Sequence, residues 1–184
     1  RSHTAINENK KIKFKYYKWD INKKLVPRHN GDWFVVSPWA LTWDDENYYM
    51  VAFDDLDQQI KHYRVDKMMR LSVEVEKRAG KDAFKNFDMA EYSKSTFGMY
   101  QGKKTRVKIE FANYMCGVFI DRFGKDITFR PIDDEHSELH VDVNVSRQFF
   151  GWIFSLGKDV KVTGPSEVVE EMKEAAKEFL SNLE

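Results

Sequence analysis

Hydrophobic and polar residues alternate near the start of the chain, as they do in a half-buried β-strand. Ile12, Phe14 and Tyr16 fall on one side of an extended segment, and lysines occupy the positions between them. Three more runs of strand length follow, at residues 33–41, 48–53 and 59–65. Each run is rich in β-branched or aromatic side chains, which favour strands.

Polar turns separate these runs. Asn30-Gly31 is a strong hairpin signal, and residues 43–47 and 54–57 form further acidic turns. Short antiparallel strands at such spacing predict a small β-barrel. We therefore expect residues 11–75 to form one β-domain.

The next segment, residues 76–104, has a different character. It contains three of the nine glycines. Its few apolar positions, Phe84, Phe87 and Tyr92, would form one apolar face of a short helix. We expect a linker with a short helix, which packs against another part of the molecule because of these aromatic side chains. Residues 1–10 are interpreted as the remnant of a preceding linker.

Regular patterning returns at residue 105. Strand, helix, strand, strand, helix, strand and helix are predicted in turn, at residues 105–112, 113–124, 126–132, 137–145, 146–157, 159–164 and 165–184. Pro165 stands in the first turn of the last helix, and an apolar face runs from Val168 to Leu183. This order predicts a ferredoxin-like βαββαβ unit in residues 105–184 with a closing C-terminal helix, so the fold class expected is α+β.

Composition narrows the class of protein. Aromatic residues make up 15% of the chain, enough to build a core and to leave stacking surfaces. Cys116 is the only cysteine, so no internal disulfide can form, and a reducing compartment is expected. No apolar run reaches the length of a membrane span, and we expect a soluble, cytoplasmic protein with no membrane contact.

Charge is distributed unevenly, although the formal net charge is zero. Residues 1–30 carry nine Lys or Arg against Glu8 and Asp20, which gives +7. A basic start and an acidic end suggest two modules with different surfaces. Alternatively, the lysines of residues 10–18 solvate an edge strand and discourage aggregation.

The sharpest signal for enzyme chemistry is a pair of histidines that flank a glutamate. Alternation along a strand places His136, Glu138 and His140 on one face, within reach of one metal ion. Any half-exposed strand with a polar face gives the same pattern, and no second cluster of ligands supports a metal site. We therefore expect no metal.

No other constellation points to catalysis. The acidic residues of the turns have no obvious histidine or serine partner, and neither a phosphate loop nor a dinucleotide fingerprint is present. We expect neither enzymatic activity nor a cofactor.

A basic and aromatic set remains in the first domain. Arg64 shares a strand face with Ile60 and His62. An arginine beside aromatic rings can bind phosphate while the rings stack on bases or sugars. In the alternative interpretation, Arg64 and Asp66 form a structural ion pair and the aromatic residues build the core.

Three of these segments resemble the WYL domain of bacterial transcriptional regulators. Pro38-Trp39-Ala40-Leu41, Tyr48-Tyr49-Met50 and Tyr63-Arg64-Val65-Asp66-Lys67-Met68 are similar to its Pro-aromatic-x-Leu, Trp-Tyr-Leu and Phe-Arg-Leu-Asp-Arg-Ile strands. Residues 105–184, which include the segment WIFSLGKDVKVTGP, resemble the C-terminal extension often found behind this domain. The two resemblances cover almost the whole chain.

The resemblance implies an SH3/Sm-like β-barrel that senses an effector, either a nucleotide or a single-stranded nucleic acid. Carried over by position, the ligand-binding residues are Ser37, Trp39, Tyr49, Arg64 and Lys67. The resemblance thus favours phosphate binding over a purely structural role for Arg64.

The chain departs from the family pattern at three positions. Tyr48 and Met50 stand where the family has tryptophan and leucine, and Lys67 stands where arginine is usual. A lysine supplies a point charge in place of a bidentate fork. The identity of the ligand is therefore open.

In the family, an N-terminal helix-turn-helix binds promoter DNA. Only about a dozen residues precede the first predicted strand, too few for such a unit. We therefore expect a fragment, or a sensor that acts through a partner, and we expect a homodimer. The alternative is an oligomerisation or protein-interaction module without a small ligand, suggested by the aromatic cluster Phe149, Phe150, Trp152 and Phe154.

Overall fold

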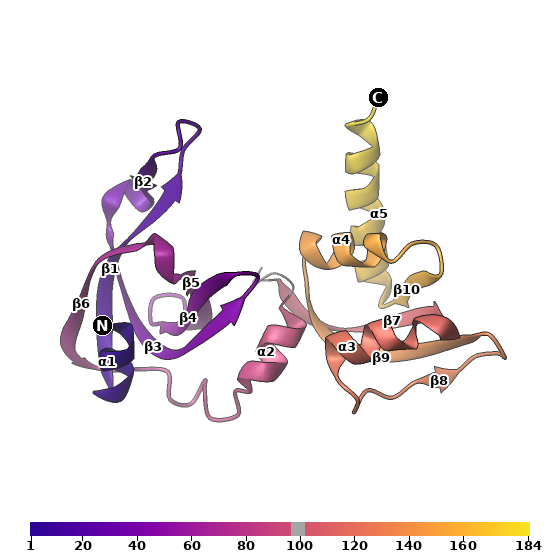
Figure 1. Ribbon diagram of the computed structural model, residues 1–184, viewed down its shortest axis with the longest axis horizontal. Helices are drawn as coiled ribbons and strands as arrows, with labels where there is room; N and C mark the ends of the chain where they lie inside the picture. Colours follow the sequence, from indigo (N-terminus) through magenta and orange to yellow (C-terminus); the bar gives the residue numbers. More distant parts are fainter. Residues whose placement is uncertain (97–101) are drawn as a thin grey trace. The chain divides into compact units, whose positions relative to one another are not determined.

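The computed structural model describes residues 1–96 and 102–184, and the chain divides into two compact units, Arg1–Asp88 and Met89–Glu184 (Figure 1). Each unit combines helices with an antiparallel sheet, so the α+β class is confirmed. Part of the linker expected between the domains, residues 97–101, lies outside the described residues. No described helix is long and apolar enough to cross a membrane.

The first unit is organised around its first strand, β1. Its elements are α1 (Ser2–Asn7), β1 (Lys10–Trp19), β2 (Leu25–Pro27), the 3-10 helix η1 (His29–Gly31), β3 (Trp33–Asp44), β4 (Asn47–Asp54), β5 (Gln59–Arg64), the 3-10 helix η2 (Val65–Lys67) and β6 (Met68–Lys77). The strands are ordered β2-β1-β3-β4-β5, and β6 also pairs with β1. All of these pairs are antiparallel.

β3 changes its partner along its length. Its N-terminal third pairs with β1 and the rest pairs with β4. The register shifts between Pro38 and Ala40, where proline has no N–H to give to a ladder. In the described part of the chain no ladder joins β5 to β6, because η2 turns the chain and β6 pairs with β1. These strands therefore form an open sheet, and not the closed barrel expected for residues 11–75.

The core of the first unit lies on the side of β1 that the alternation predicts. Ile12 and Phe14 are fully buried, and the rings of Phe14 and Phe34 stack with centroids 5.6 Å apart. The buried cluster consists of Ala5, Ile12, Phe14, Val36, Met50, Ala52, Tyr63 and Met68. It joins side chains from α1 and from every strand of the unit except β2.

A helix occupies the segment that resembled a linker remnant, residues 1–10. α1 packs on β1, β3 and β6, and Ala5 is completely buried. Nη1 of Arg1 donates a hydrogen bond of 2.9 Å to the carbonyl of Leu71. A helix of six residues with one buried side chain has no apolar periodicity, so no sequence pattern marks it.

The second unit consists of a sheet and the helices that pack on it (Figure 1). Its elements are α2 (Met89–Ser95), β7 (Lys103–Ala112), the 3-10 helix η4 (Asn113–Met115), α3 (Cys116–Phe123), β8 (Arg130–Pro131), β9 (His136–Val145), α4 (Arg147–Ser155), β10 (Val160–Gly164) and α5 (Ser166–Ser181). The strand order is β10-β7-β9-β8, and every neighbouring pair is antiparallel.

One face of this sheet carries the second core. Strand residues Val107, Ile109, Phe111, Leu139 and Val143 are buried beneath helix residues Phe119, Phe149, Ile153 and Val168. The strand predicted at residues 126–132 shortens to β8, whose two residues pair with Glu138 and Ser137. Ile127 and Phe129 pack against the core without joining a ladder.

Candidate functional site

The five residues carried over from the family fall into two groups. Ser37 and Trp39 lie on β3, whereas Tyr49, Arg64 and Lys67 lie on β4, β5 and η2. Ser37 is paired with Phe53, which is four residues from Tyr49 along β4. At about 3.3 Å per strand residue, Ser37 is therefore roughly 13 Å from the level of Tyr49. The structure brings Tyr49, Arg64 and Lys67 together and separates Ser37 from them.

Ser37 and Trp39 hold the segment that follows β6. The hydroxyl of Ser37 is buried and accepts a hydrogen bond of 2.8 Å from the N–H of Ala79. The indole N–H of Trp39 donates a bond of 3.0 Å to the carbonyl of Ala79. The Trp39 ring also stacks on Phe84, with centroids 5.0 Å apart, and the Arg78 guanidinium lies 3.9 Å from its centroid. Both residues are therefore engaged within the first unit.

Gly80 allows this segment to approach the sheet so closely. Its φ is +82°, and a Cβ at this position would lie 2.3 Å from Cγ of Phe53. Because only glycine fits both the backbone conformation and the space, residues 78–84 depend on it to reach Ser37 and Trp39.

Tyr49 and Arg64 are directly opposite each other in the β4–β5 ladder. The Arg64 guanidinium binds Asp66 with two hydrogen bonds, 3.0 Å from Nε and 2.7 Å from Nη2. These bonds lower the pKa of the Asp66 carboxyl group. The ion pair is exposed, with 36% and 54% of the two side chains accessible, and such pairs contribute little stability. A phosphate can therefore replace the carboxylate at small cost.

Lys67 has an environment unlike that of Arg64. Only 7% of its surface is exposed, and its ammonium group lies 4.4 Å from the ring centroid of Trp19. Among the described residues no carboxylate lies within 4.0 Å of this group. Lysines are rarely so buried unless they are paired. Lys67 thus forms no salt bridge with a described carboxylate, although its charge contributes to lowering the pKa of the Asp66 carboxyl group.

Tyr16 and Trp19 of β1 border this group, although neither belongs to the set carried over from the family. The hydroxyl of Tyr16 accepts a hydrogen bond of 3.0 Å from the backbone N–H of Arg64, and the Arg28 guanidinium lies 5.3 Å from the centroid of its ring. Trp19 is 58% exposed. Tyr16 shares the apolar side of β1, so alternation alone assigns it to the core.

Charge at the site comes from arginine and lysine and not from histidine. His62 lies on β5 next to Tyr63, and its ring centroid is 5.8 Å from that of Tyr49. Burial lowers the pKa of His62 to about 4, so the side chain is neutral at pH 7. Burial also raises the pKa of the Tyr49 hydroxyl, which Arg64 partly opposes.

The histidines of β9 do not assemble a metal centre with Glu138. Glu138 is nearly fully buried, and it binds Lys108 at 2.7 Å and also binds Arg130. His136 is paired with Asp133 at 2.9 Å. The described residues contain no group of three or more His, Cys, Asp or Glu side chains that could hold a metal ion.

Comparisons with known proteins match both units. The WYL domain model matches residues 2–73, and the WCX domain model matches residues 103–180. A search of curated proteins found no match. Among solved structures, proteasome accessory factor B/C (PafBC) of Arthrobacter aurescens is 16% identical, with 94% of this chain and 25% of that chain covered and a TM-score of 0.41. A CRISPR Cas-related protein is also 16% identical, with 100% of this chain and 52% of that chain covered and a TM-score of 0.52.

The chain spans a quarter of the first of these structures and about half of the second. At this identity, the second likeness concerns the fold alone. The two domain matches cover the sheets of both units, including α1, β1 and the Arg64–Lys67 segment. The chain therefore belongs to the WYL-domain family, with a WYL domain followed by a WCX domain.

Proposed function

We propose that this chain is the effector-sensing region of a bacterial transcriptional regulator, and that its effector is a nucleotide or a single-stranded nucleic acid. Lys67 carries the proposal. It is a nearly buried cation beside Arg64, and no carboxylate of the described residues pairs with it. A phosphate has the charge and the size needed to pair with this ammonium group.

In the proposed site, Arg64 and Lys67 bind phosphate and Tyr49 contacts a base or a sugar. The guanidinium of Arg64 can exchange the Asp66 carboxylate for a phosphate, because a phosphate also offers two oxygen atoms to the guanidinium N–H groups. In this proposal Ser37 and Trp39 anchor residues 78–84 and do not contact the ligand directly.

The remaining features of the regulator are proposed on the same basis. The protein would act in the cytoplasm by binding and not by catalysis, and it would form a homodimer. A helix-turn-helix elsewhere in the regulator would bind promoter DNA. The WYL and WCX matches support this arrangement, since the resemblance to WYL regulators implies it.

We also propose that the units are variants of two known architectures. An SH3/Sm-like barrel that stays open is supported by β3, which pairs with β1 and then with β4. A ferredoxin-like unit is supported by the strand order β10-β7-β9-β8, with α3 after β7 and α4 after β9.

Calorimetric titration of the 184-residue chain with mononucleotides, cyclic nucleotides and short single-stranded oligonucleotides tests the ligand site. We expect Arg64→Ala and Lys67→Ala each to weaken binding about tenfold or more, because a hydrogen bond to a charged group contributes on the order of 1.5–3 kcal/mol. The affinity of the unaltered protein should fall as salt rises.

Arg70→Ala is the matched control for this experiment. Arg70 is an exposed arginine of β6, close to Lys67 in sequence, and its removal changes the net charge equally. We expect Arg70→Ala to bind these ligands with the affinity of the unaltered chain. Binding that survives both Arg64→Ala and Lys67→Ala without loss excludes the proposed site.

A second candidate function, oligomerisation, is favoured by apolar side chains on the helices of the second unit. Of the aromatic cluster in α4, Phe149 is buried and Phe154 is exposed. Phe179, Leu180 and Leu183, at the end of the chain, are also exposed. A second protomer would bury such side chains.

A further inference from the structure

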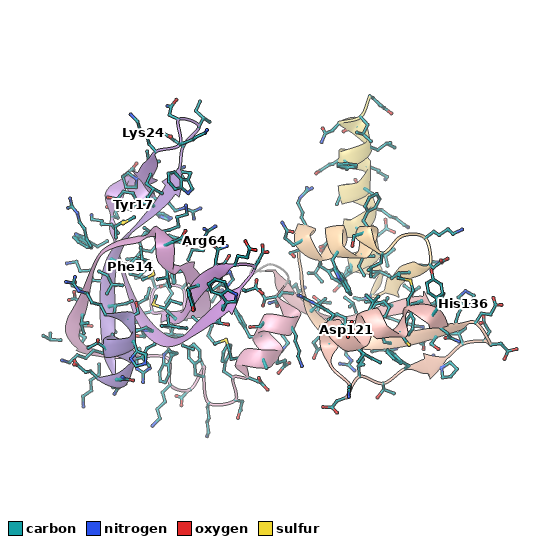
Figure 2. All side chains as sticks on the ribbon, in the orientation of Figure 1. Phe14, Tyr17, Lys24, Arg64, Asp121 and His136 are labelled. Atoms are coloured by element: carbon teal, nitrogen blue, oxygen red, sulfur yellow. The ribbon has the colours of Figure 1, made fainter. Side chains whose placement is uncertain are left out.

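The end of β1, β2 and η1 form an arm, residues 17–31, which extends from the rest of the first unit with Lys24 near its tip (Figure 2). The arm contains four cations, Lys18, Lys23, Lys24 and Arg28, against the single carboxylate of Asp20, which gives +3. Oδ1 of Asp20 accepts hydrogen bonds of 2.9 Å from the backbone N–H groups of Asn22 and Lys24. The carboxylate is therefore directed to its own turn and not to the cations at the base of the arm.

A shallow cavity of about 370 Å³ lies at the base of the arm. Its walls are Lys18, Pro27, Arg28, His29 and Asn30. Neither Lys18 nor Arg28 has a carboxylate within 4.0 Å among the described residues. The cavity is thus lined by basic and polar groups whose charge the protein itself leaves unbalanced.

Tyr16 connects this cavity to the Arg64–Lys67 site. Its ring faces the Arg28 guanidinium, and its hydroxyl accepts the N–H of Arg64. On the arm side, the exposed ring of Trp19 lies under the ammonium group of Lys67. Tyr16 therefore contacts both Arg28 and the backbone of Arg64, and Trp19 of the same strand contacts Lys67.

We propose that the arm cavity is a second phosphate site, and that the ligand is a single-stranded nucleic acid of several nucleotides and not a mononucleotide. Arg28 and Lys18 bind one phosphate of the chain, and Arg64 and Lys67 bind another. Trp19 provides an exposed ring on which a base can stack. The inference rests on the proposed function for the class of ligand, but its residues are distinct from those of the Arg64–Lys67 site.

Nucleic acid fits this surface better than an anionic membrane does. Of the exposed apolar residues of the arm, Ile21 lies in the turn between β1 and β2 and Trp19 lies beside Lys67, whereas the cavity and its unpaired cations are at the base beside Tyr16. A bilayer would contact the tip first, whereas a flexible polyanion can reach both the cavity and the Arg64–Lys67 site.

The inference is tested by measuring how the full chain binds thymidine monophosphate and a twelve-nucleotide oligodeoxythymidylate over a series of salt concentrations. We expect Lys18→Gln/Arg28→Gln to weaken oligonucleotide binding about tenfold or more. The slope of log affinity against log salt should become shallower by about 0.7, since Lys18 and Arg28 bind one phosphate and each phosphate contact on a single strand contributes about 0.7. Binding of the monophosphate should stay within about twofold of the unaltered chain, because it needs only the Arg64–Lys67 site.

Lys23→Gln/Lys24→Gln is the matched control, because it removes the same charge from the tip of the same arm. Equal losses in the two double variants would show a general effect of charge and overturn the inference. If Arg64→Ala weakens the binding of both ligands while Lys18→Gln/Arg28→Gln weakens the binding of neither, the proposed function is supported and the arm site is excluded. If only Lys18→Gln/Arg28→Gln weakens oligonucleotide binding, the Arg64–Lys67 site is excluded and the arm site is supported. Binding to phosphatidylserine vesicles without any oligonucleotide binding overturns the nucleic-acid proposal, and circular dichroism checks that each variant is folded.

Discussion

At the level of single residues, the presence or absence of a carboxylate partner distinguishes the cations of the first unit. Arg64 is paired with Asp66 through two hydrogen bonds, whereas Lys67 and Arg28 rest against aromatic rings. The sequence left two interpretations of Arg64 open, a structural ion pair or a phosphate ligand. The ion pair is present, but its exposure keeps phosphate binding available.

His62 makes the stability of the first unit depend on pH. Its pKa is about 4 in the folded chain and 6.5 when unfolded, so between these values the unfolded chain binds more protons. The free energy of unfolding should therefore fall as pH decreases from 6.5 toward 4, by up to about 1.4 kcal/mol per pH unit, and should not depend on His62 above pH 6.5.

Urea unfolding followed by tryptophan fluorescence measures this dependence, since four of the five tryptophans lie in the first unit. His62→Gln should have a flatter pH dependence than the unaltered chain between pH 5 and 6.5. Parallel curves for the two proteins would contradict the assignment to His62.

At the level of elements, sequence patterns predicted most of the long strands but not β6, and they missed the features that depend on tertiary contacts. Alternation at Ile12 and Phe14 marks the core side of β1, and both residues are buried. Residues 2–7 carry no pattern, because Ala5 is the one buried side chain of α1. The contact between Tyr16 and Arg64 joins residues 48 positions apart, so no local pattern could place Tyr16 at the site.

Gly80 is expected to control the segment between β6 and α2. Gly80→Ala adds a Cβ that would lie 2.3 Å from Cγ of Phe53 and imposes a φ of +82° on alanine. We expect a loss of about 2–4 kcal/mol in the free energy of unfolding of the first unit, from backbone strain and overpacking together. Trypsin should also cleave faster at Lys81, because the contacts of Ala79 with Ser37 and Trp39 would loosen.

Gly31→Ala separates the two causes of this loss. Gly31 has nearly the same φ, +81°, but its Cβ would make only an ordinary contact of 3.8 Å with Pro27. We expect it to cost about 1 kcal/mol, from backbone strain alone. If both variants lose the same stability, the approach of Gly80 to Phe53 has no energetic importance.

At the level of the whole molecule, each of the two units has its own sheet and its own buried cluster. The WYL and WCX matches fall on separate units, in agreement with the resemblance of each half of the sequence to a different domain. The candidate ligand-binding residues carried over from the family all belong to the first unit. The second unit offers a different feature, because the end of α5 carries large apolar side chains that the described residues leave exposed.

Association of two chains through the end of α5 is the expected consequence. Burying an apolar side chain of this size contributes about 1.5–3 kcal/mol, so Phe179→Ser/Leu183→Ser should raise the dissociation constant of a dimer tenfold or more. Sedimentation equilibrium over a range of concentrations measures this change. Glu170→Ser/Lys173→Ser, which removes an exposed ion pair from the same helix and preserves net charge, should leave the dimer intact. A chain that sediments as a monomer at every concentration, or a dimer indifferent to the apolar substitutions, would exclude this face of α5 as the interface.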